Sequence, residues 1–284
     1  MTRCCLCAVE QLVQTLNSDG DAITGVTSLA GEIYLLRWKE RDHLEVYDVI
    51  TYRLQRCLTV PNICGFTDMT SCEQYSCVYI GDYGVECVHR LDVQGAVTRW
   101  AVDDKPACLS VNAAAHSVIV TCPDVRKIKE FSSHGDLVRE VLVPDDDISP
   151  WHAVPARSGG QFIVCHGGLA DPVHRVYVMS ADGRRIVHSH GGQPGSDTGQ
   201  YNVPGHLAVD DNGSVFVADV FNRRVTLLSP TLEYVRQVLL GDQLKWWPYR
   251  LYLDSQQHLL YIAVNEWNAE RRRYTAGRVV VFSV

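Results

Sequence analysis

Short apolar blocks alternate with polar turns along the whole chain, and the blocks recur at a regular interval. Each copy opens at a proline and continues through runs of β-branched and aromatic residues that are typical of strands. Successive opening prolines are 45, 44, 54 and 44 residues apart, at Pro61, Pro106, Pro150, Pro204 and Pro248. One four-stranded propeller blade needs roughly 40–50 residues. The pattern therefore predicts an all-β propeller without amphipathic helices.

The second strand of each copy is a continuous apolar run, as expected for a strand that is packed on both faces. These runs cover residues 33–36, 78–81, 118–121, 162–165, 215–218 and 260–263. Six runs predict a six-bladed ring. Because each blade needs its neighbours to bury its faces, we expect residues 1–284 to form a single domain.

The sixth copy ends after its third strand, residues 279–282, so the sequence that follows supplies no outer strand. Residues 10–16 resemble the outer strand of the fifth copy, residues 233–239. A ring without this strand would leave two unpaired sheet edges. We therefore predict that residues 8–17 form the outer strand of the last blade and close the ring.

One copy carries a pattern that resembles a known repeat family. Residues 204–210 (PGHLAVD), 215–219 (VFVAD) and 222–225 (NRRV) are similar to the NHL repeat, and the sixth copy keeps Pro248, LYLD and LYIA. The resemblance implies the six-bladed ring of tripartite-motif-NHL proteins. It also implies a platform that binds protein or RNA partners, often as the substrate-recognition part of a ubiquitin-ligase pathway. Because no RING, B-box or coiled coil precedes the repeats, we expect no ligase activity in this chain itself.

Composition limits the classes of partner, and the cellular compartment, that we expect for this protein. The net charge of −7 does not favour nucleic-acid binding by bulk charge, and DNA is not expected as a partner. No apolar run is long enough to cross a membrane, and no secretory signal pattern is present. Five of the eleven cysteines, at 57, 77, 108, 122 and 165, lie in strand-like runs, where free thiols behave as small apolar residues. We expect a monomeric, cytoplasmic protein without a cofactor, since the cysteines at 4, 5 and 7 have no matching second pair for zinc.

Two register positions bring polar residues to one face of the predicted ring, around its central channel. The first position lies two residues after the opening proline and holds Cys108, His152, His206 and Arg250. The second follows the inner apolar run and holds Arg37, Asp82, Cys122, His166, Asp219 and Val264. One interpretation is structural, because polar channel walls must satisfy buried backbone groups. In that case Asp219 binds the Asn222–Arg223 segment of its own repeat.

A second interpretation is partner recognition at the same face, where aromatic residues gather beside the polar ones. Aromatic side chains in such loops anchor peptides or stack on bases. The predicted partner-binding residues are Trp38, Tyr83, Trp151, His152, His206, Arg223, Trp247, Tyr249 and Arg250. The acidic balance favours a protein or peptide partner. Single-stranded RNA is the alternative, because basic residues collect beside aromatic ones in the last two copies, at 223–224, 245, 250 and 271–273.

A third interpretation is a zinc enzyme. Peptidyl-hydroxyglycine lyases resemble NHL propellers and hold zinc through histidines from different blades, which implies Cys108, His152 and His206 as ligands here. Arg250 in the same ring and the lack of a secretory signal argue against this activity. No serine, cysteine or carboxylate pair has neighbours that mark it as a catalytic group. We therefore expect a non-enzymatic binding module with no metal.

Overall fold

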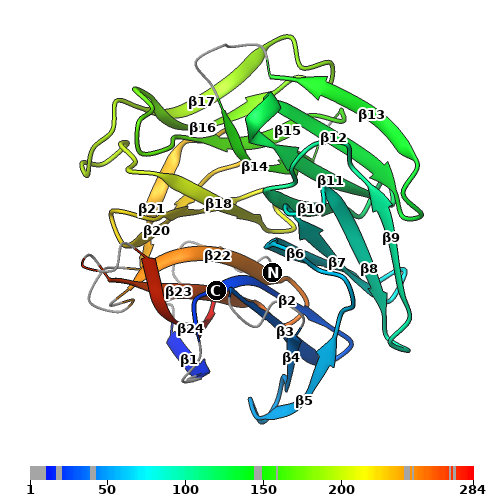
Figure 1. Cartoon of the computed structure of the whole chain (residues 1–284). Coiled ribbons are helices and arrows are strands. Elements are labelled where there is room, and N and C mark those ends of the chain that lie inside the picture. Colours follow the sequence, from blue (N-terminus) through cyan, green and yellow to red (C-terminus); the bar gives the residue numbers. More distant parts are fainter. Residues whose placement is uncertain are drawn as a thin grey trace, which may run out of the picture.

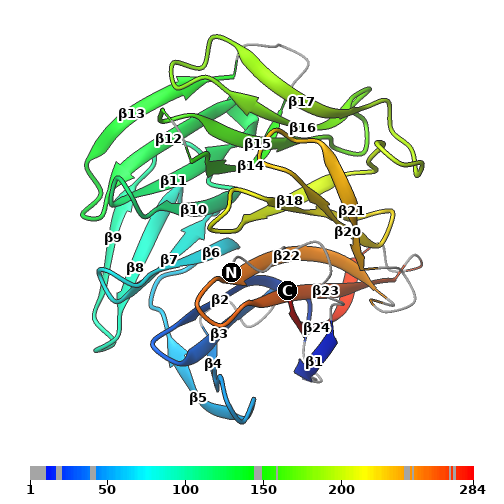
Figure 2. The same cartoon turned by 180° about the vertical axis from the view of Figure 1, so that it is seen from behind.

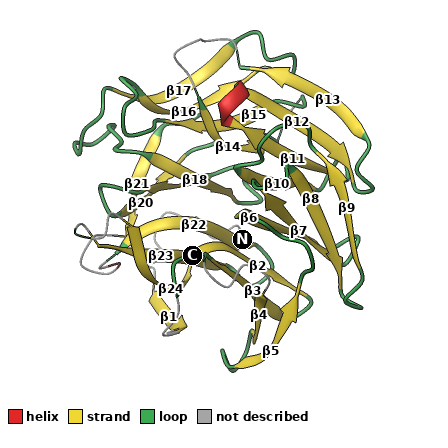
Figure 3. Cartoon of the chain, viewed as in Figure 1, coloured by secondary structure: helices red, strands yellow, loops and turns green. Residues whose placement is uncertain are grey.

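The chain forms a ring of six antiparallel four-stranded sheets, a six-bladed β-propeller (Figure 1). The computed structural model describes residues 11–16, 21–38, 43–143, 149–157, 159–239, 244, 246–268, 270 and 273–284. Strands make up nearly all of its regular structure, and a short 3-10 turn lies at Pro123–Val125 (Figure 3). The predicted fold class is confirmed.

Five blades run in simple chain order from the innermost strand to the outermost. The first blade comprises β2 (Ile23–Leu29), β3 (Glu32–Arg37), β4 (His43–Asp48) and β5 (Leu54–Thr59). The second comprises β6 (Phe66–Cys72), β7 (Cys77–Asp82), β8 (Cys87–Asp92) and β9 (Val97–Ala101). The third comprises β10 (Cys108–Asn112), β11 (Ser117–Cys122), β12 (Lys127–Ser132) and β13 (Leu137–Leu142). The fourth comprises β14 (Pro150–Pro155), β15 (Phe162–His166), β16 (His174–Met179) and β17 (Ile186–Gly192). The fifth comprises β18 (Pro204–Val209), β19 (Val215–Asp219), β20 (Arg224–Leu228) and β21 (Tyr234–Leu239).

The sixth blade is assembled from both ends of the chain. It contains β22 (Trp247–Asp254), β23 (Leu259–Asn268) and β24 (Arg273–Ser283), and β1 (Gln11–Leu16) is its outer strand. Antiparallel pairing of β1 with β24 runs from Gln11↔Ser283 to Leu16↔Val279. The predicted closure by the N-terminal strand is thereby confirmed for the described part of residues 8–17, and both views of the ring show it (Figures 1 and 2).

The hydrophobic core is divided into six clusters, one between each pair of neighbouring blades. Every predicted second-strand run lies in a buried strand, from β3 to β23. The cluster between the sixth and first blades joins Leu16, Ile23 and Val281, which lie at the two ends of the chain. Burial between blades, rather than within any single sheet, therefore stabilises the ring.

The β18–β19 hairpin turns at Asn212-Gly213. Gly213 has φ +85°, and its N–H donates to the Asp210 carbonyl at 2.9 Å, so the pair closes this hairpin. In the sixth blade the hairpin of β23 and β24 continues to the pair Asn268↔Arg273. Residues 271 and 272 themselves lie outside the described part of the chain, as does Lys245.

One face of the ring gathers the residues that lead into the first strands and leave the second strands. Register pairs such as Pro150↔His166, Pro204↔Asp219 and Pro248↔Val264 place both positions at the same end of each blade. We call this end the loop face. Among the described residues, no helix has the length and apolarity that crossing a membrane requires.

Candidate functional site

Six residues at one register position surround the axis of the propeller. Each lies on an innermost strand, and the equivalence follows from their partners at the end of each second strand, as in Asp68↔Gly81 and His206↔Ala218. The six residues, here called the central ring, are Gly25, Asp68, Cys108, His152, His206 and Arg250. A Cβ atom added to Gly25 would lie 2.9 Å from Cγ of Met69. The lack of a side chain at this position therefore leaves room for the neighbouring residues.

Asp68 holds the central ring together. Its carboxylate accepts hydrogen bonds from the Leu109 N–H at 2.9 Å, from Arg250 Nε at 3.0 Å and from His206 Nε2 at 3.3 Å. Asp68 is 1% exposed and Arg250 6%, so the two charges form a buried ion pair. Burial opposes ionisation of Asp68, but Arg250 and His206 outweigh it and lower the pKa of the carboxyl to about 2.

The two histidines of the central ring are stacked, with ring centroids 3.8 Å apart. In each ring Nδ1 accepts a backbone N–H: Leu207 donates to His152 at 3.0 Å, and Leu251 donates to His206 at 3.3 Å. Each Nε2 must then carry the proton, which His152 donates to the Leu109 carbonyl at 3.2 Å. Both imidazoles are therefore neutral members of a hydrogen-bonded network.

Acid is expected to destabilise the fold through these histidines. Burial lowers the pKa of His152 and His206 below 6.5, the value of an exposed histidine, and the pKa values of His166 and His190 are lowered by the same cause. Below about pH 6.5 the histidines bind protons in the unfolded chain but stay neutral in the folded chain. The free energy of unfolding therefore falls as the pH falls. Urea unfolding at a series of pH values from about 7 to about 5 measures this slope.

The variant His206→Gln tests that expectation. It removes one titrating group, so its slope should be shallower than that of the wild type by up to about 1.4 kcal/mol per pH unit. The exposed His188→Gln serves as the control and should leave the slope unchanged. Equal slopes in all three proteins would contradict the assignment of buried neutral histidines.

The central ring does not suit the zinc site suggested by Cys108, His152 and His206. The donor atoms that lie within 4.8 Å of one another belong to Asp68, Cys108 and His206, and His152 is not among them. Both ring nitrogens of His152 already form hydrogen bonds with the backbone. The Asp68 carboxylate already accepts a hydrogen bond from the Arg250 guanidinium. Burial also raises the pKa of the Cys108 thiol well above its usual range. The central ring is a buried, hydrogen-bonded polar network that contains the ion pair of Asp68 and Arg250.

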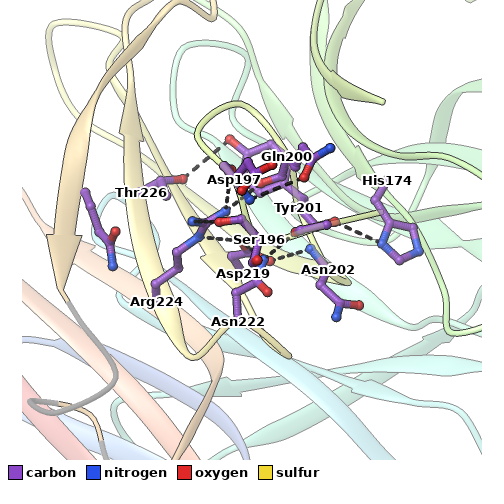
Figure 4. Close-up of polar contacts among 12 residues, drawn as sticks. His174, Ser196, Asp197, Gln200, Tyr201, Asn202, Asp219, Asn222, Arg224 and Thr226 are labelled. Atoms are coloured by element: carbon purple, nitrogen blue, oxygen red, sulfur yellow. Dashed lines mark hydrogen bonds and ion pairs between the residues drawn. The ribbon is translucent and has the colours of Figure 1, made fainter. Parts of the chain in front are cut away.

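The repeat pattern of the fifth blade has a structural role (Figure 4). Asp219 accepts hydrogen bonds at 2.7 Å from the Asn202 N–H, from Asn222 Nδ2 and from Arg224 Nε. The guanidinium of Arg224 also donates to the carbonyls of residues 196, 197 and 200. The predicted contact of Asp219 with its own repeat is present, but Arg224 makes the ion pair, whereas Arg223 is exposed with φ +51°.

The predicted partner-binding residues divide into two groups. His152, His206 and Arg250 are 1%, 5% and 6% exposed, so the expectation that they contact a partner does not fit their burial in the central ring. The others lie at the loop face, exposed or partly buried: Trp38, Tyr83, Trp151, Arg223, Trp247 and Tyr249. Sequence alone could not distinguish the groups, because both lie in the same segments, at the blade entries and the loops after the second strands.

A pocket opens between the fifth and sixth blades at the loop face. Its volume is about 340 Å³, and we call it the aromatic pocket; its lining residues are Phe221, Arg223, Trp246, Trp247, Asn265, Glu266 and Trp267. Trp247 lies at its centre, with ring centroids 5.5 Å from Phe221 and 6.1 Å from Trp267. Arg223 and Glu266 are both exposed, so the pocket carries one charge of each sign.

Two parts of these sites escaped the sequence analysis. Asp68 lies seven residues after Pro61 instead of two, which hid its equivalence to His152; its signal was that it is the one charged residue in the strand FTDMTSC. The wall of the aromatic pocket formed by Glu266 and Trp267 depends on the extended β23–β24 hairpin. Residues 264–268 (VNEWN) do not alternate between apolar and polar positions, so the sequence carried no strand pattern for this extension.

Comparison with known proteins supports the fold and leaves the family open. No protein-family model matches the chain, and no curated protein matches it. Among solved structures, hydrazine synthase of Kuenenia stuttgartiensis has a TM-score of 0.63 at 12% identity, over 94% of this chain and 97% of that chain. The Cps50 (Swd1) β-propeller domain of Myceliophteria thermophila has a TM-score of 0.61 at 12% identity, over 97% and 99%. Virginiamycin B lyase from Staphylococcus aureus has a TM-score of 0.63 at 9% identity, again over 97% and 99%. At these identities the similarity establishes a six-bladed β-propeller and no shared activity.

Proposed function

We propose that this propeller is a non-catalytic interaction module that binds a protein or peptide partner at its loop face. The observation that carries the proposal is the aromatic pocket, where indole and phenyl rings from two blades surround one cavity. Large aromatic side chains beside an arginine are the residues that dominate binding energy in protein interfaces. The partner would place an apolar side chain in the pocket, against Trp247 and its neighbouring rings.

The charges around the aromatic pocket favour a peptide over single-stranded RNA. Arg223 and Glu266 both line the pocket, so its lining carries one charge of each sign. Arg278 lies over the Trp246 ring at 4.4 Å, and Arg250 is bound to Asp68 inside the ring. Two of the basic groups that would neutralise phosphates are thus engaged within the protein, and the whole chain carries a net charge of −7.

The NHL-like pattern of the fifth blade extends this proposal to a biological setting. Such a module would recognise a substrate for a ubiquitin ligase in the cytoplasm. The eight described cysteines are all free thiols, which suits a reducing compartment.

A displayed library of short peptides, presented to the full chain, tests the proposal. Peptides selected on the wild type should bind Trp247→Ala at least about 30-fold more weakly, the loss expected of an interface hot spot. Trp38→Ala is the matched control, because Trp38 is 56% exposed at the same face but belongs to the first blade. Calorimetric titration measures each affinity, and melting temperatures verify that both variants are folded.

Single-stranded RNA oligonucleotides provide the opposing outcome. Tight RNA binding with a steep salt dependence, lost in Trp247→Ala, would replace the peptide with RNA as the partner. Equal peptide binding by wild type and Trp247→Ala would remove the aromatic pocket from the proposal. Failure to select any peptide, together with no RNA binding, would overturn the proposed function.

A further inference from the structure

The second blade contains a cluster of three metal-ligating side chains outside the central ring and the aromatic pocket. Asp82 ends β7 and is the register partner of Cys87, which begins β8; His89 follows two residues later on the same side of that strand. All three are buried, with exposures of 0%, 5% and 1%. Their donor atoms all lie within 4.8 Å of one another.

The spacing of these donor atoms suits one tetrahedral ion. Cys87 Sγ is 3.3 Å from His89 Nε2, and His89 Nε2 is 3.4 Å from Asp82 Oδ2. Zinc bonds of about 2.3 Å to sulfur and about 2.0–2.2 Å to nitrogen and oxygen place tetrahedral ligands roughly 3.3–3.6 Å apart. Thiolate, imidazole and carboxylate together are a ligand set that zinc accepts.

The equivalent carboxylate in the fifth blade shows what the second blade lacks. There the register pair is Asp219↔Arg224, and the guanidinium neutralises the buried carboxylate at 2.7 Å. In the second blade Cys87 occupies the position of Arg224. Within the described part of the chain, Asp82 forms no ion pair with a lysine or arginine, so its buried charge has no permanent cation. A bound divalent ion would take the place of the guanidinium.

The surroundings of Asp82 and His89 leave the ligand atoms available. Asp82 Oδ1 accepts the N–H groups of residues 65, 84 and 85, which turns Oδ2 toward His89. Four backbone N–H groups thus donate to Asp82, three to Oδ1 and that of Cys64 to Oδ2, and such donors favour the carboxylate form. Among the described residues His89 Nδ1 has no hydrogen-bond partner, unlike Nδ1 of His152 and His206, so no such contact fixes the proton on Nε2.

We propose that Asp82, Cys87 and His89 form a zinc site that neutralises the buried carboxylate and fastens the β7–β8 hairpin of the second blade. Cys64 lies beside the site: its N–H donates to Asp82 Oδ2 at 2.8 Å, and its side chain reaches the surface. The fourth ligand is the Cys64 thiolate or a water molecule. Because zinc binds a cysteine as the thiolate, binding releases a proton and weakens in acid.

Metal analysis and cobalt substitution test this site in the full chain. After incubation with zinc and gel filtration, the wild type should retain about one ion per chain. With cobalt it should show the near-ultraviolet charge-transfer band of a thiolate ligand and the intense visible bands of tetrahedral coordination. Cys87→Ala and His89→Gln should each lose the ion and these bands. Cys122→Ala is the control, because Cys122 is equally buried and ends the second strand of the third blade.

The variant Cys87→Arg separates metal binding from folding. It rebuilds the Asp–Arg pair of the fifth blade, so it should fold without zinc, and a chelator should lower the melting temperature of the wild type but not that of Cys87→Arg. Retention of zinc by Cys64→Ser would assign the fourth ligand to water; its loss would assign it to the thiolate. A wild type that retains no zinc, or a Cys87→Ala variant that retains it fully, would overturn the proposal.

Discussion

Deletion of residues 1–16 is expected to make the protein aggregate and lose its cooperative unfolding transition. The deletion removes β1, so the edge of β24 between Val279 and Ser283 loses its hydrogen-bonded partner. It also removes Leu16, which is 3% exposed in the core between the sixth and first blades. At about 1 kcal/mol for each ladder hydrogen bond and about 2 kcal/mol for the leucine, the loss approaches the whole stability of a typical domain, roughly 5–15 kcal/mol. Size-exclusion chromatography and thermal unfolding followed by circular dichroism measure both effects.

Two controls make that experiment specific to ring closure. Deletion of residues 1–9 leaves β1 in place and should leave the melting temperature within a few degrees of the wild type. A synthetic peptide of residues 8–17, added to the truncated chain during refolding, should restore the soluble monomer by pairing with β24. A truncated protein that stays monomeric with unchanged melting would show that β1 is dispensable.

The repeat made the fold predictable because each blade must bury its second strand on both faces in the same way. A run such as residues 215–218 must be apolar on both faces, whatever its neighbours are, so the period survives even where identities do not. Closure was predictable for a related reason: a sixth blade without an outer strand requires one from elsewhere in the chain. The loop face followed from the same register.

The functions of individual polar residues were not predictable in this way. His206 and Trp247 both lie within two residues of the opening proline of their copies. His206 nevertheless faces the axis among buried charges, whereas Trp247 lines the aromatic pocket. His206 is buried because the side chains of the central ring fill the axis of the propeller. That filling depends on residues from six different blades, which a single repeat does not reveal. Likewise, Asp82 and Cys87 come together because they pair across the β7–β8 turn. Only the comparison with the Asp219↔Arg224 pair of the fifth blade shows that Cys87 stands where a cation stands there.

Replacing Asp68 by asparagine is expected to be the most destabilising single substitution in the central ring. The variant keeps the shape of the side chain but leaves the buried guanidinium of Arg250 without its counter-ion, at 6% exposure. Removing one partner of a buried ion pair costs about 3–5 kcal/mol, because the remaining charge is neither solvated nor neutralised. The hydrogen bonds from His206 and from the Leu109 N–H weaken as well, since a neutral amide oxygen is a poorer acceptor than a carboxylate. Urea unfolding at neutral pH measures the loss.

The double variant Asp68→Asn with Arg250→Met identifies the cause. Once both charges are gone, the buried cation no longer penalises the fold, and most of the lost stability should return. Asp211→Asn, in the exposed β18–β19 turn, is the control and should change stability by less than about 0.5 kcal/mol. If the double variant were no more stable than Asp68→Asn alone, the carboxylate would act through its hydrogen bonds to His206 and Leu109 and not through Arg250. Because the low pKa of Asp68 places its titration near pH 2, acidification to about pH 4 should leave this ion pair intact while the buried histidines already weaken the fold.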